Sequence, residues 1–378
     1  MKKVCKAIEQ IDKARDRANQ KREASKKPKV KTIKTIAAVA AVILATITST
    51  MAQQQYRGLG QFVLGTIYNA PTNPPGYTVY NFKITGTADD KSAIGRIGFK
   101  FPPPEIPLLG YVPLFTGHDG NSWWSNTGDN SPAQQKLGQN ITPADMAAYL
   151  DGLVSAGYAV IQIQWLSNGW ITSPLGVALG FKTLAIQPAT VLKWNRDTYA
   201  TGDLKLKAAG VSGGSYQLAA ALIVYGLGSI QPPAVKPVVD EAYIVSGPPY
   251  THLREGCLQA NGWQFSSSAA VLMNLPDGIR GPSGPCTQHD VSWSQFWDAD
   301  SLESEPPENF GMATQMYFLQ GKRDNPNEIK SRQNDLMARM DAQGSSTFMM
   351  IANTMGHPLN KEGANLLFNA LATPPQTP

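Results

Sequence analysis

The sequence predicts an α/β fold built around a parallel sheet. Apolar, strand-like runs alternate with helix-like segments in two separate parts of the chain. In the first part, a strand-like run at 111–115 is followed by a helix over 143–156 and a second strand-like run at 158–165. The same alternation recurs between residues 204 and 245. Strands that alternate with helices along the chain typically lie parallel in one sheet.

Positive charge is concentrated at the N-terminus. The 378-residue chain has a net charge of +5, but residues 1–34 hold 13 Lys and Arg against four acids, a net of +9. The other 344 residues therefore carry a net charge of −4. A mildly acidic folded part argues against nucleic-acid binding, so no nucleic-acid partner is expected.

An apolar run of about a dozen residues, 36–47, follows this basic segment and ends near the small residues of Thr50-Met51-Ala52. The run is shorter than the roughly 20 residues that a membrane span needs. Residues 1–52 are therefore predicted to be a signal peptide, with an uncleaved signal anchor as the alternative. The protein is expected to be secreted or periplasmic, and to contact a membrane only if this segment is retained.

The next residues lead into the folded domain, predicted over 76–378. Residues 53–75 are rich in Gln, Pro and Asn and are predicted to be a tether. Alternation of apolar and polar residues over 77–84 and 93–101 predicts two antiparallel strands.

Helix signals mark the first part of the domain. Thr142 is a good cap, Pro143 suits the first helical turn, and Asp145 is an early acid. The helix they begin is expected to end at Gly157. A further helix is predicted over 188–194.

A glycine-rich turn, Gly210-Val-Ser-Gly-Gly214, lies between the predicted strand 204–209 and a helix over 217–225. A nucleophile on a sharp strand-to-helix turn needs small neighbours, because a side chain at a flanking glycine would collide with the adjacent strand or helix. This context predicts that Ser212 is a nucleophile and that the turn is more than a flexible loop.

Residues 250–312 interrupt the alternation and are predicted to be an inserted cap. They contain Cys257 and Cys286, whereas the third cysteine, Cys5, lies in the targeting segment. An even pair in an exported protein is expected to form a disulfide, the alternative being two buried thiols. Neither cysteine has a metal-ligating neighbour at zinc-finger spacing, so no metal site is predicted here.

The alternation resumes after the insert. The predicted elements are a strand at 315–320, a helix over 326–342, a strand at 346–351 and a helix over 360–371. A serine nucleophile needs a histidine base and a carboxylate that orients it. His357 follows the last strand and Asp324 follows the strand before it, in the order serine, acid, histidine. Asp240 and Asp290 are weaker alternatives for the acid.

Backbone amides are expected to complete the site. Gly213 follows the nucleophile, and its N–H is a candidate oxyanion donor. The loop Thr116-Gly-His118 follows the strand 111–115, and the backbone of His118 is the second candidate. Tryptophans after strands of the active face are predicted to bind an apolar part of the substrate, with core packing as the alternative, namely Trp123, Trp124 and Trp165.

These motifs together resemble the α/β-hydrolase superfamily over roughly residues 105–373, and several segments look like those of little-characterised secreted bacterial serine hydrolases. The resemblance implies a mostly parallel sheet of about eight strands, helices on both faces, no cofactor, and acyl transfer through an acyl-enzyme. The loop Thr116-Gly-His118 departs from the His-Gly of many members. The predicted activity is hydrolysis of a small-molecule or polymeric carboxylic ester by an esterase or lipase-like enzyme. A serine peptidase and a non-catalytic binding protein on the same fold are the alternatives.

Overall fold

The computed structural model describes residues 58–87, 92–167, 169–230, 234, 236–247 and 251–374. The predicted signal segment, residues 1–52, and the start of the predicted tether lie outside the described residues. The described strands are β1 (Gln61–Ile67), β2 (Thr78–Thr85), β3 (Ala93–Lys100), β4 (Gly110–Phe115), β5 (Tyr158–Trp165), β6 (Lys205–Val211), β7 (Glu241–Val245), β8 (Gln315–Gly321) and β9 (Thr347–Ala352).

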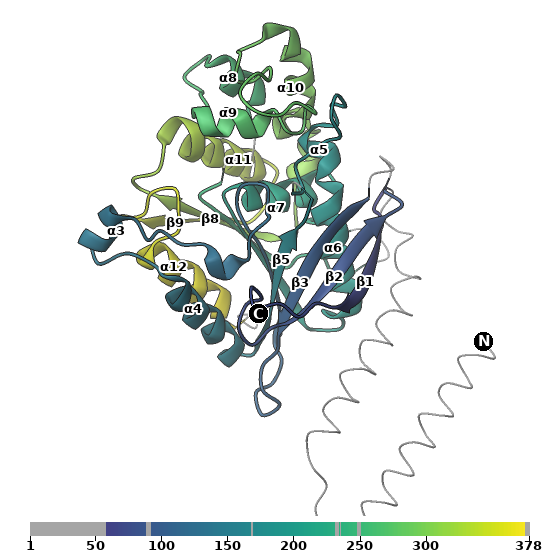
Figure 1. Cartoon of the computed structure of the whole chain (residues 1–378), viewed down its shortest axis with the longest axis vertical. Coiled ribbons are helices and arrows are strands. Elements are labelled where there is room, and N and C mark those ends of the chain that lie inside the picture. Colours follow the sequence, from purple (N-terminus) through teal and green to yellow (C-terminus); the bar gives the residue numbers. More distant parts are fainter. Residues whose placement is uncertain are drawn as a thin grey trace, which may run out of the picture. The chain divides into compact units, whose positions relative to one another are not determined.

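Helices follow most of these strands (Figure 1). The α-helices are α3 (Pro132–Lys136), α4 (Pro143–Ser155), α5 (Gly180–Leu184), α6 (Ile186–Thr198), α7 (Gly213–Ile223), α8 (Leu253–Leu258), α9 (Ser267–Met273), α10 (Ser294–Asp300), α11 (Ser331–Ala342) and α12 (Lys361–Ala372). Short 3-10 turns are η1 (Trp124–Asn126), η2 (Val291–Trp293), η3 (Leu302–Ser304) and η4 (Pro307–Phe310), and η5 (Pro326–Lys330) is a π-helical turn.

One sheet of nine strands organises the described part of the chain, in the order β1-β2-β3-β5-β4-β6-β7-β8-β9. The pairs from β1 to β5 are antiparallel, and all pairs from β5 to β9 are parallel. The predicted mostly parallel sheet is confirmed. The parallel part brings the carboxyl ends of β4, β6, β7, β8 and β9 to the same edge, where predicted site residues follow β4, β6, β8 and β9.

The predicted tether is wrong for residues 61–67, which form the edge strand β1. Phe62 is buried and stacks on the indole of Trp194 with ring centroids 4.0 Å apart. Phe62 and Leu64 lie two residues apart and therefore share one face of the strand, which was the sequence signal for β1. The polar residues around them obscured this signal.

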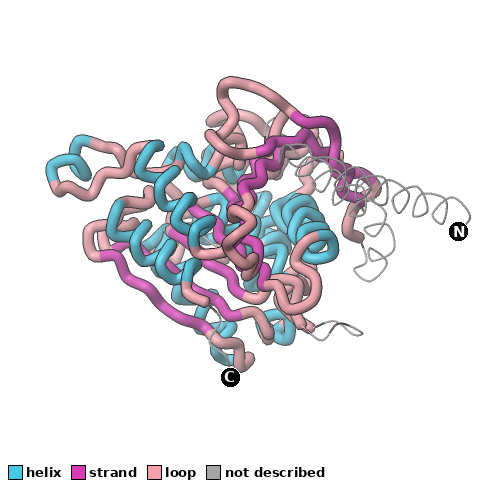
Figure 2. The backbone as a smooth tube through the Cα atoms, turned by 90° about the horizontal axis from the view of Figure 1, so that it is seen from below, coloured by secondary structure: helices cyan, strands magenta, loops and turns pink. Residues whose placement is uncertain are grey.

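Helices cover both faces of the sheet (Figure 2). On one face α4 and α12 pack against alternate residues of the central strands, such as Val160 of β5 and Val211 of β6. On the other face α6, α7 and α11 pack against the intervening residues, such as Ile161 and Leu206. Strand side chains point alternately to the two faces, so two cores form, one on each side.

The insert predicted over 250–312 forms a set of short helices, and α8, α9 and α10 lie together beside α11 and α5 (Figure 1). The predicted disulfide is present: Cys257 of α8 is bonded to Cys286, 29 residues later. Both cysteines are buried. Within the described ranges, no helix combines the length and apolar character needed to cross a membrane.

Candidate active site

Ser212 lies at a strained turn between β6 and α7. Its backbone has φ 52° and ψ −120°, a conformation that residues with a side chain rarely adopt. The Ser212 N–H donates to the carbonyl of Val245 on the neighbouring strand β7, at 2.9 Å. The strain and this hydrogen bond together lift the serine above the sheet edge and fix its direction, as expected for a nucleophile elbow.

The glycines of the turn are required by close backbone contacts. A Cβ on Gly210 would lie 2.1 Å from the carbonyl oxygen of Gly214, and a Cβ on Gly214 would lie 2.1 Å from that of Phe115. Real Cβ atoms do not approach oxygens this closely, so any side chain would force the strands and α7 apart. The packing therefore accounts for the glycine spacing seen in the sequence.

A buried serine holds the turn against β7. The Ser215 hydroxyl lies 2.9 Å from the carbonyl oxygens of both Gly210 and Val245, to which it can donate. It also accepts a hydrogen bond from the Val245 N–H at 3.1 Å. Gly247 packs so closely on Ser215 that a Cβ there would lie 2.0 Å from the Ser215 Cβ. These contacts fix the turn without involving the Ser212 hydroxyl.

His357 contacts the serine directly. Its Nε2 lies 2.8 Å from the Ser212 hydroxyl oxygen. The histidine follows β9 in a loop that Glu362 of α12 secures, since that carboxylate accepts from the backbone amides of Asn353 and Thr354 at 2.9 and 2.8 Å. The His357 imidazole thus reaches the serine from a loop whose backbone is held by hydrogen bonds.

Asp324 faces the other side of the imidazole. One carboxylate oxygen lies 3.5 Å from Nδ1 of His357, slightly longer than a normal hydrogen bond, and also accepts from the Asn325 N–H at 2.8 Å. Gly321 lets the end of β8 pack closely against the segment before His357, because a Cβ on Gly321 would lie 2.4 Å from the Met355 carbonyl oxygen. With the imidazole proton assigned to Nδ1, which faces the carboxylate, Nε2 is left to accept the serine proton.

The electrostatic surroundings favour the protonated imidazole. Burial by itself lowers the pKa of His357, but the hydrogen bond and charge of Asp324, together with the charge of Glu328, outweigh burial and leave the pKa above its ordinary value. An imidazolium formed by taking a proton from Ser212 would be stabilised by the same carboxylates.

The predicted oxyanion donors lie beside one another. Gly213 approaches the backbone of His118 so closely that a Cβ on the glycine would lie 2.3 Å from the His118 carbonyl oxygen and 3.0 Å from its nitrogen. His118 has φ 56°, and the preceding Gly117 packs against the Ser212 side chain. Among the described residues, neither the Gly213 nor the His118 amide has a hydrogen-bond acceptor. Two donors are thus available next to Ser212.

A pocket of about 410 Å³ opens over these residues. One wall comes from the insert, where α9 contributes Ala269 and Leu272 with Ser266 just before the helix. A neighbouring part of the lining comes from the segment after Asp324, where Glu328 and Ile329 are buried in η5 and Glu328 accepts from the Ser266 hydroxyl at 3.1 Å. Sequence reasoning placed a cap here but singled out neither wall. Glu328 could have been found because it follows Asp324 by four residues, in the segment expected to start a helix.

Three tryptophans predicted to bind substrate do not line this pocket, so that prediction is wrong. Trp123, Trp124 and Trp165 are at most 3% exposed. Trp124 packs in the core beside α4, and the Trp165 indole N–H donates to Gln217 of α7 at 2.7 Å. Their positions after β4 and at the end of β5 turn them into the protein interior, because helices cover the sheet there.

The alternative acids are engaged elsewhere. Asp240 forms a buried ion pair with Arg196 and accepts from the Leu206 N–H at 2.8 Å. Asp290 lies on the insert and caps η2 through the Ser292 N–H. Asp324 is therefore the acid that the fold brings to His357.

Comparison with known proteins finds solved structures that share little sequence with this chain. No protein-family model matches the chain, and no curated protein matches it. A brefeldin A esterase, described as a bacterial homologue of human hormone sensitive lipase, is 13% identical with a TM-score of 0.47, covering 88% of this chain and 81% of that one. Acetyl xylan esterase 1 from Thermoanaerobacterium sp. is 11% identical with a TM-score of 0.48, covering 87% and 92%. Esterase 2 from Thermogutta terrifontis, with butyrate bound, is 14% identical with a TM-score of 0.44, covering 79% and 91%.

The fold is assigned from the chain's own topology. Of the eight strands from β2 to β9, β3 alone runs in the opposite direction to the others. In the sheet, β5 precedes β4, so the order of these two strands is exchanged relative to the sequence. The strained turn at Ser212 connects β6 to α7. Helices cover both faces of the sheet. The chain has the α/β-hydrolase fold, with one additional edge strand and an inserted cap.

Proposed function

We propose that this protein hydrolyses carboxylic esters through an acyl-enzyme, with Ser212, His357 and Asp324 as its catalytic triad. The contact of 2.8 Å between the Ser212 hydroxyl and Nε2 of His357, at a turn where Ser212 has φ 52°, carries the proposal. A serine hydroxyl is a weak nucleophile until a base accepts its proton, and this geometry supplies the base.

In the first half of the reaction, His357 accepts the Ser212 proton as the serine oxygen bonds to the ester carbonyl carbon. The carbonyl oxygen becomes an oxyanion that accepts hydrogen bonds from the amides of Gly213 and His118. His357 then gives the proton to the leaving alcohol as the ester bond breaks. Asp324 orients the imidazole and stabilises its positive charge.

In the second half, a water molecule attacks the acyl-enzyme carbonyl and gives its proton to His357. The tetrahedral intermediate collapses, the bond to the Ser212 oxygen breaks, and the serine recovers its proton from His357. The products are a carboxylic acid and an alcohol. No step uses a metal or an organic cofactor.

The pocket supports a small ester as substrate. Its volume of about 410 Å³ lies at the lower end of the range for small-molecule sites. Its wall combines the apolar Leu272 and Ile329 with the hydroxyls of Ser266 and Ser268. Such a lining suits a short acyl group with a polar neighbour better than a long fatty chain.

We further propose that the enzyme is exported. The apolar run at 36–47 preceding small residues supports a signal segment, and the Cys257–Cys286 disulfide supports an oxidising destination. Fractionation of expressing cells and N-terminal sequencing of the mature protein would test both export and cleavage near Ala52. A protein found only in the cytoplasm with intact N-terminus would contradict this proposal.

Substitution of the nucleophile tests the activity. The Ser212→Ala variant should lose hydrolysis of p-nitrophenyl acetate and butyrate by at least about 10⁴-fold, and should no longer be labelled by a fluorophosphonate. Peptide mapping of the labelled wild-type protein should place the label on Ser212. Ser229→Ala, which removes a hydroxyl that donates to the Gly311 carbonyl at 3.3 Å, is the matched control and should keep both properties.

Two outcomes would contradict the proposal. Undiminished ester turnover in Ser212→Ala would exclude this serine as the nucleophile. A folded wild-type protein that neither turns over esters nor reacts with fluorophosphonate would indicate a binding protein on this fold. A parallel screen of peptide and ester substrates would distinguish peptidase activity, since the same triad cleaves amides.

A further inference from the structure

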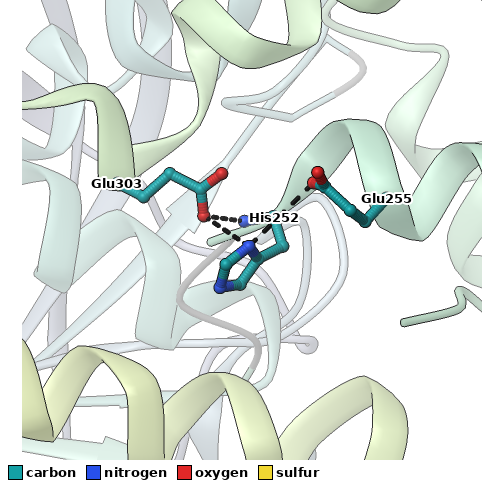
Figure 3. A group of neighbouring side chains, drawn as sticks. All are labelled: His252, Glu255 and Glu303. Carbon is teal, nitrogen blue, oxygen red and sulfur yellow. Dashed lines mark hydrogen bonds and ion pairs between the residues drawn. The ribbon is translucent and has the colours of Figure 1, made fainter. Parts of the chain in front are cut away.

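A second group of chemically active side chains lies at the base of the cap, outside the proposed triad. His252 stands at the start of the insert, Glu255 one turn later in α8, and Glu303 near its end in η3 (Figure 3). We propose that these three residues form a binding site for a divalent metal ion of the zinc class. The inference does not depend on the ester hydrolysis proposed above.

The three ligand atoms are already gathered for a single ion. Nδ1 of His252 lies 2.9 Å from one Glu303 carboxylate oxygen and 3.9 Å from one of Glu255, and all three atoms lie within 4.8 Å of one another. Zinc bonds to nitrogen and oxygen are about 2.0–2.2 Å long, which places neighbouring ligands about 3–3.5 Å apart. A small movement of the Glu255 side chain would close the site. Both carboxylates point toward the imidazole (Figure 3).

A fourth residue orients the imidazole as metal sites require. Asp335 of α11 lies 3.4 Å from Nε2 of His252, on the side of the ring away from the two glutamates. Arg339 donates to the same Asp335 oxygen at 2.9 Å and fixes it. A carboxylate that accepts from the far nitrogen leaves Nδ1 as the metal-binding atom, the arrangement usual for metal-ligating histidines.

An unpaired carboxylate oxygen also favours a cation at this site. Arg339 pairs with Asp335, and Glu303 accepts from the backbone N–H of His252 at 2.6 Å. The buried guanidinium of Arg332 also lies near, donating to the His252 carbonyl at 3.1 Å. Glu255 lies 3.9 Å from the imidazole, beyond hydrogen-bond distance. Among the described residues, the inward Glu255 oxygen has no hydrogen-bond donor although it is shielded from solvent. A divalent ion bound to Nδ1 of His252 would give this oxygen a partner at bonding distance. Burying an unpaired carboxylate oxygen is costly, so the site favours the ion.

The ligand types indicate the class of metal. One imidazole nitrogen with two carboxylates suits zinc and similar transition ions, while magnesium and calcium prefer oxygen ligands alone. The three side chains are about one-fifth exposed, so water can complete the coordination sphere. An ion here would connect both ends of the insert, close to the disulfide at Cys257, and would stabilise the cap.

Zinc binding to the purified protein tests the proposal. After chelator treatment, titration with zinc chloride should give one ion per chain by calorimetry and a higher melting temperature. Glu255→Gln and Glu303→Gln should each weaken zinc affinity by at least about 10-fold, and Asp335→Asn by about 10- to 100-fold. Asp298→Asn, which alters an exposed acid of the same insert, is the matched control and should bind zinc like the wild type.

A second background removes the competing histidine of the proposed triad. The titration is repeated in His357→Ala, where zinc binding at the base of the cap should persist. The stacked indole of Trp263, 4.2 Å from the His252 ring, should report zinc by a fluorescence change that Trp263→Phe removes. Binding that is lost in His357→Ala, or equal in wild type and both glutamine variants, would overturn the proposal. Calcium or magnesium binding tighter than zinc would overturn the metal class.

Discussion

Stability should rise at neutral pH when a buried carboxylate of the cap is neutralised. Asp277 is 3% exposed, and one of its carboxylate oxygens has no hydrogen-bond partner among the described residues. Burial, followed by the charge of Asp300, raises the pKa of Asp277 to about 7. Asp300 itself accepts from the backbone amides of Phe181 and Lys182 at 2.7 and 2.9 Å, so it is tied to α5.

The size of the effect follows from proton linkage. An Asp whose pKa is raised by folding binds more protons in the folded state than in the unfolded state. Its contribution to the free energy of unfolding is therefore complete below the unfolded pKa of 3.8 and is lost as the pH rises to about 7. The difference corresponds to on the order of 4 kcal/mol, an upper limit because the surroundings relax. Asp277→Asn removes the ionisation while keeping the shape. We expect about 2–4 kcal/mol of added stability at pH 8 and little change at pH 4.

Thermal unfolding at several pH values is the assay. A gain of this size should raise the melting temperature of Asp277→Asn by about 4–8 °C at pH 8, with the difference shrinking toward pH 4. Asp298→Asn, which changes a half-exposed acid of the same insert, should stay within about 0.5 kcal/mol of the wild type at both pH values. A stability difference for Asp277→Asn that is constant between pH 4 and 8, or a loss of stability at pH 8, would refute the reasoning.

Two further substitutions probe the proposed site. Glu328→Gln removes a negative charge that raises the pKa of His357. Because a general base works only when it is neutral, the acidic limb of the kcat/KM profile for p-nitrophenyl butyrate should move to lower pH. An unmoved limb would contradict this electrostatic role of Glu328. Gly214→Ala places a Cβ 2.1 Å from the Phe115 carbonyl oxygen and should cost about 1–3 kcal/mol in urea unfolding together with most esterase activity. Gly152→Ala, in α4 with open space around it, should instead stabilise by about 0.5–1 kcal/mol, and equal effects at the two glycines would show that close contact is not the cause.

Local signals in the sequence were sufficient for most of the sheet and for the centre of the site. The turn around Ser212 was recognisable because its glycines are demanded by backbone contacts within a few residues of the serine. Asp324 and His357 could be chosen because each follows a predicted strand, and parallel strands end at one edge. The predicted helix over 143–156 appears as α4, with Thr142 and Asp145 forming the expected capping box.

Signals that depend on distant packing were missed or misread. Strand β1 has only a short apolar alternation, and its stability comes from pairing with β2 and from the contact between Phe62 and Trp194. The direction of Trp165 was misjudged because its environment depends on α7, which supplies the hydrogen-bonding Gln217. A tryptophan at a strand end looks the same in sequence whether a helix or a ligand covers it.

Patterns within short stretches of sequence were enough to predict the order of the strands and helices after β1, the turn at Ser212 and the residues that follow the strands. Which of these residues meet depends on how the elements pack in the folded protein. This packing set the 2.8 Å contact between Ser212 and His357, placed Glu328 near the base, and gathered His252, Glu255 and Glu303 across a 51-residue separation. Local hydrogen bonding and side-chain alternation are encoded over a few residues, whereas electrostatic and metal-binding clusters depend on how separate elements pack.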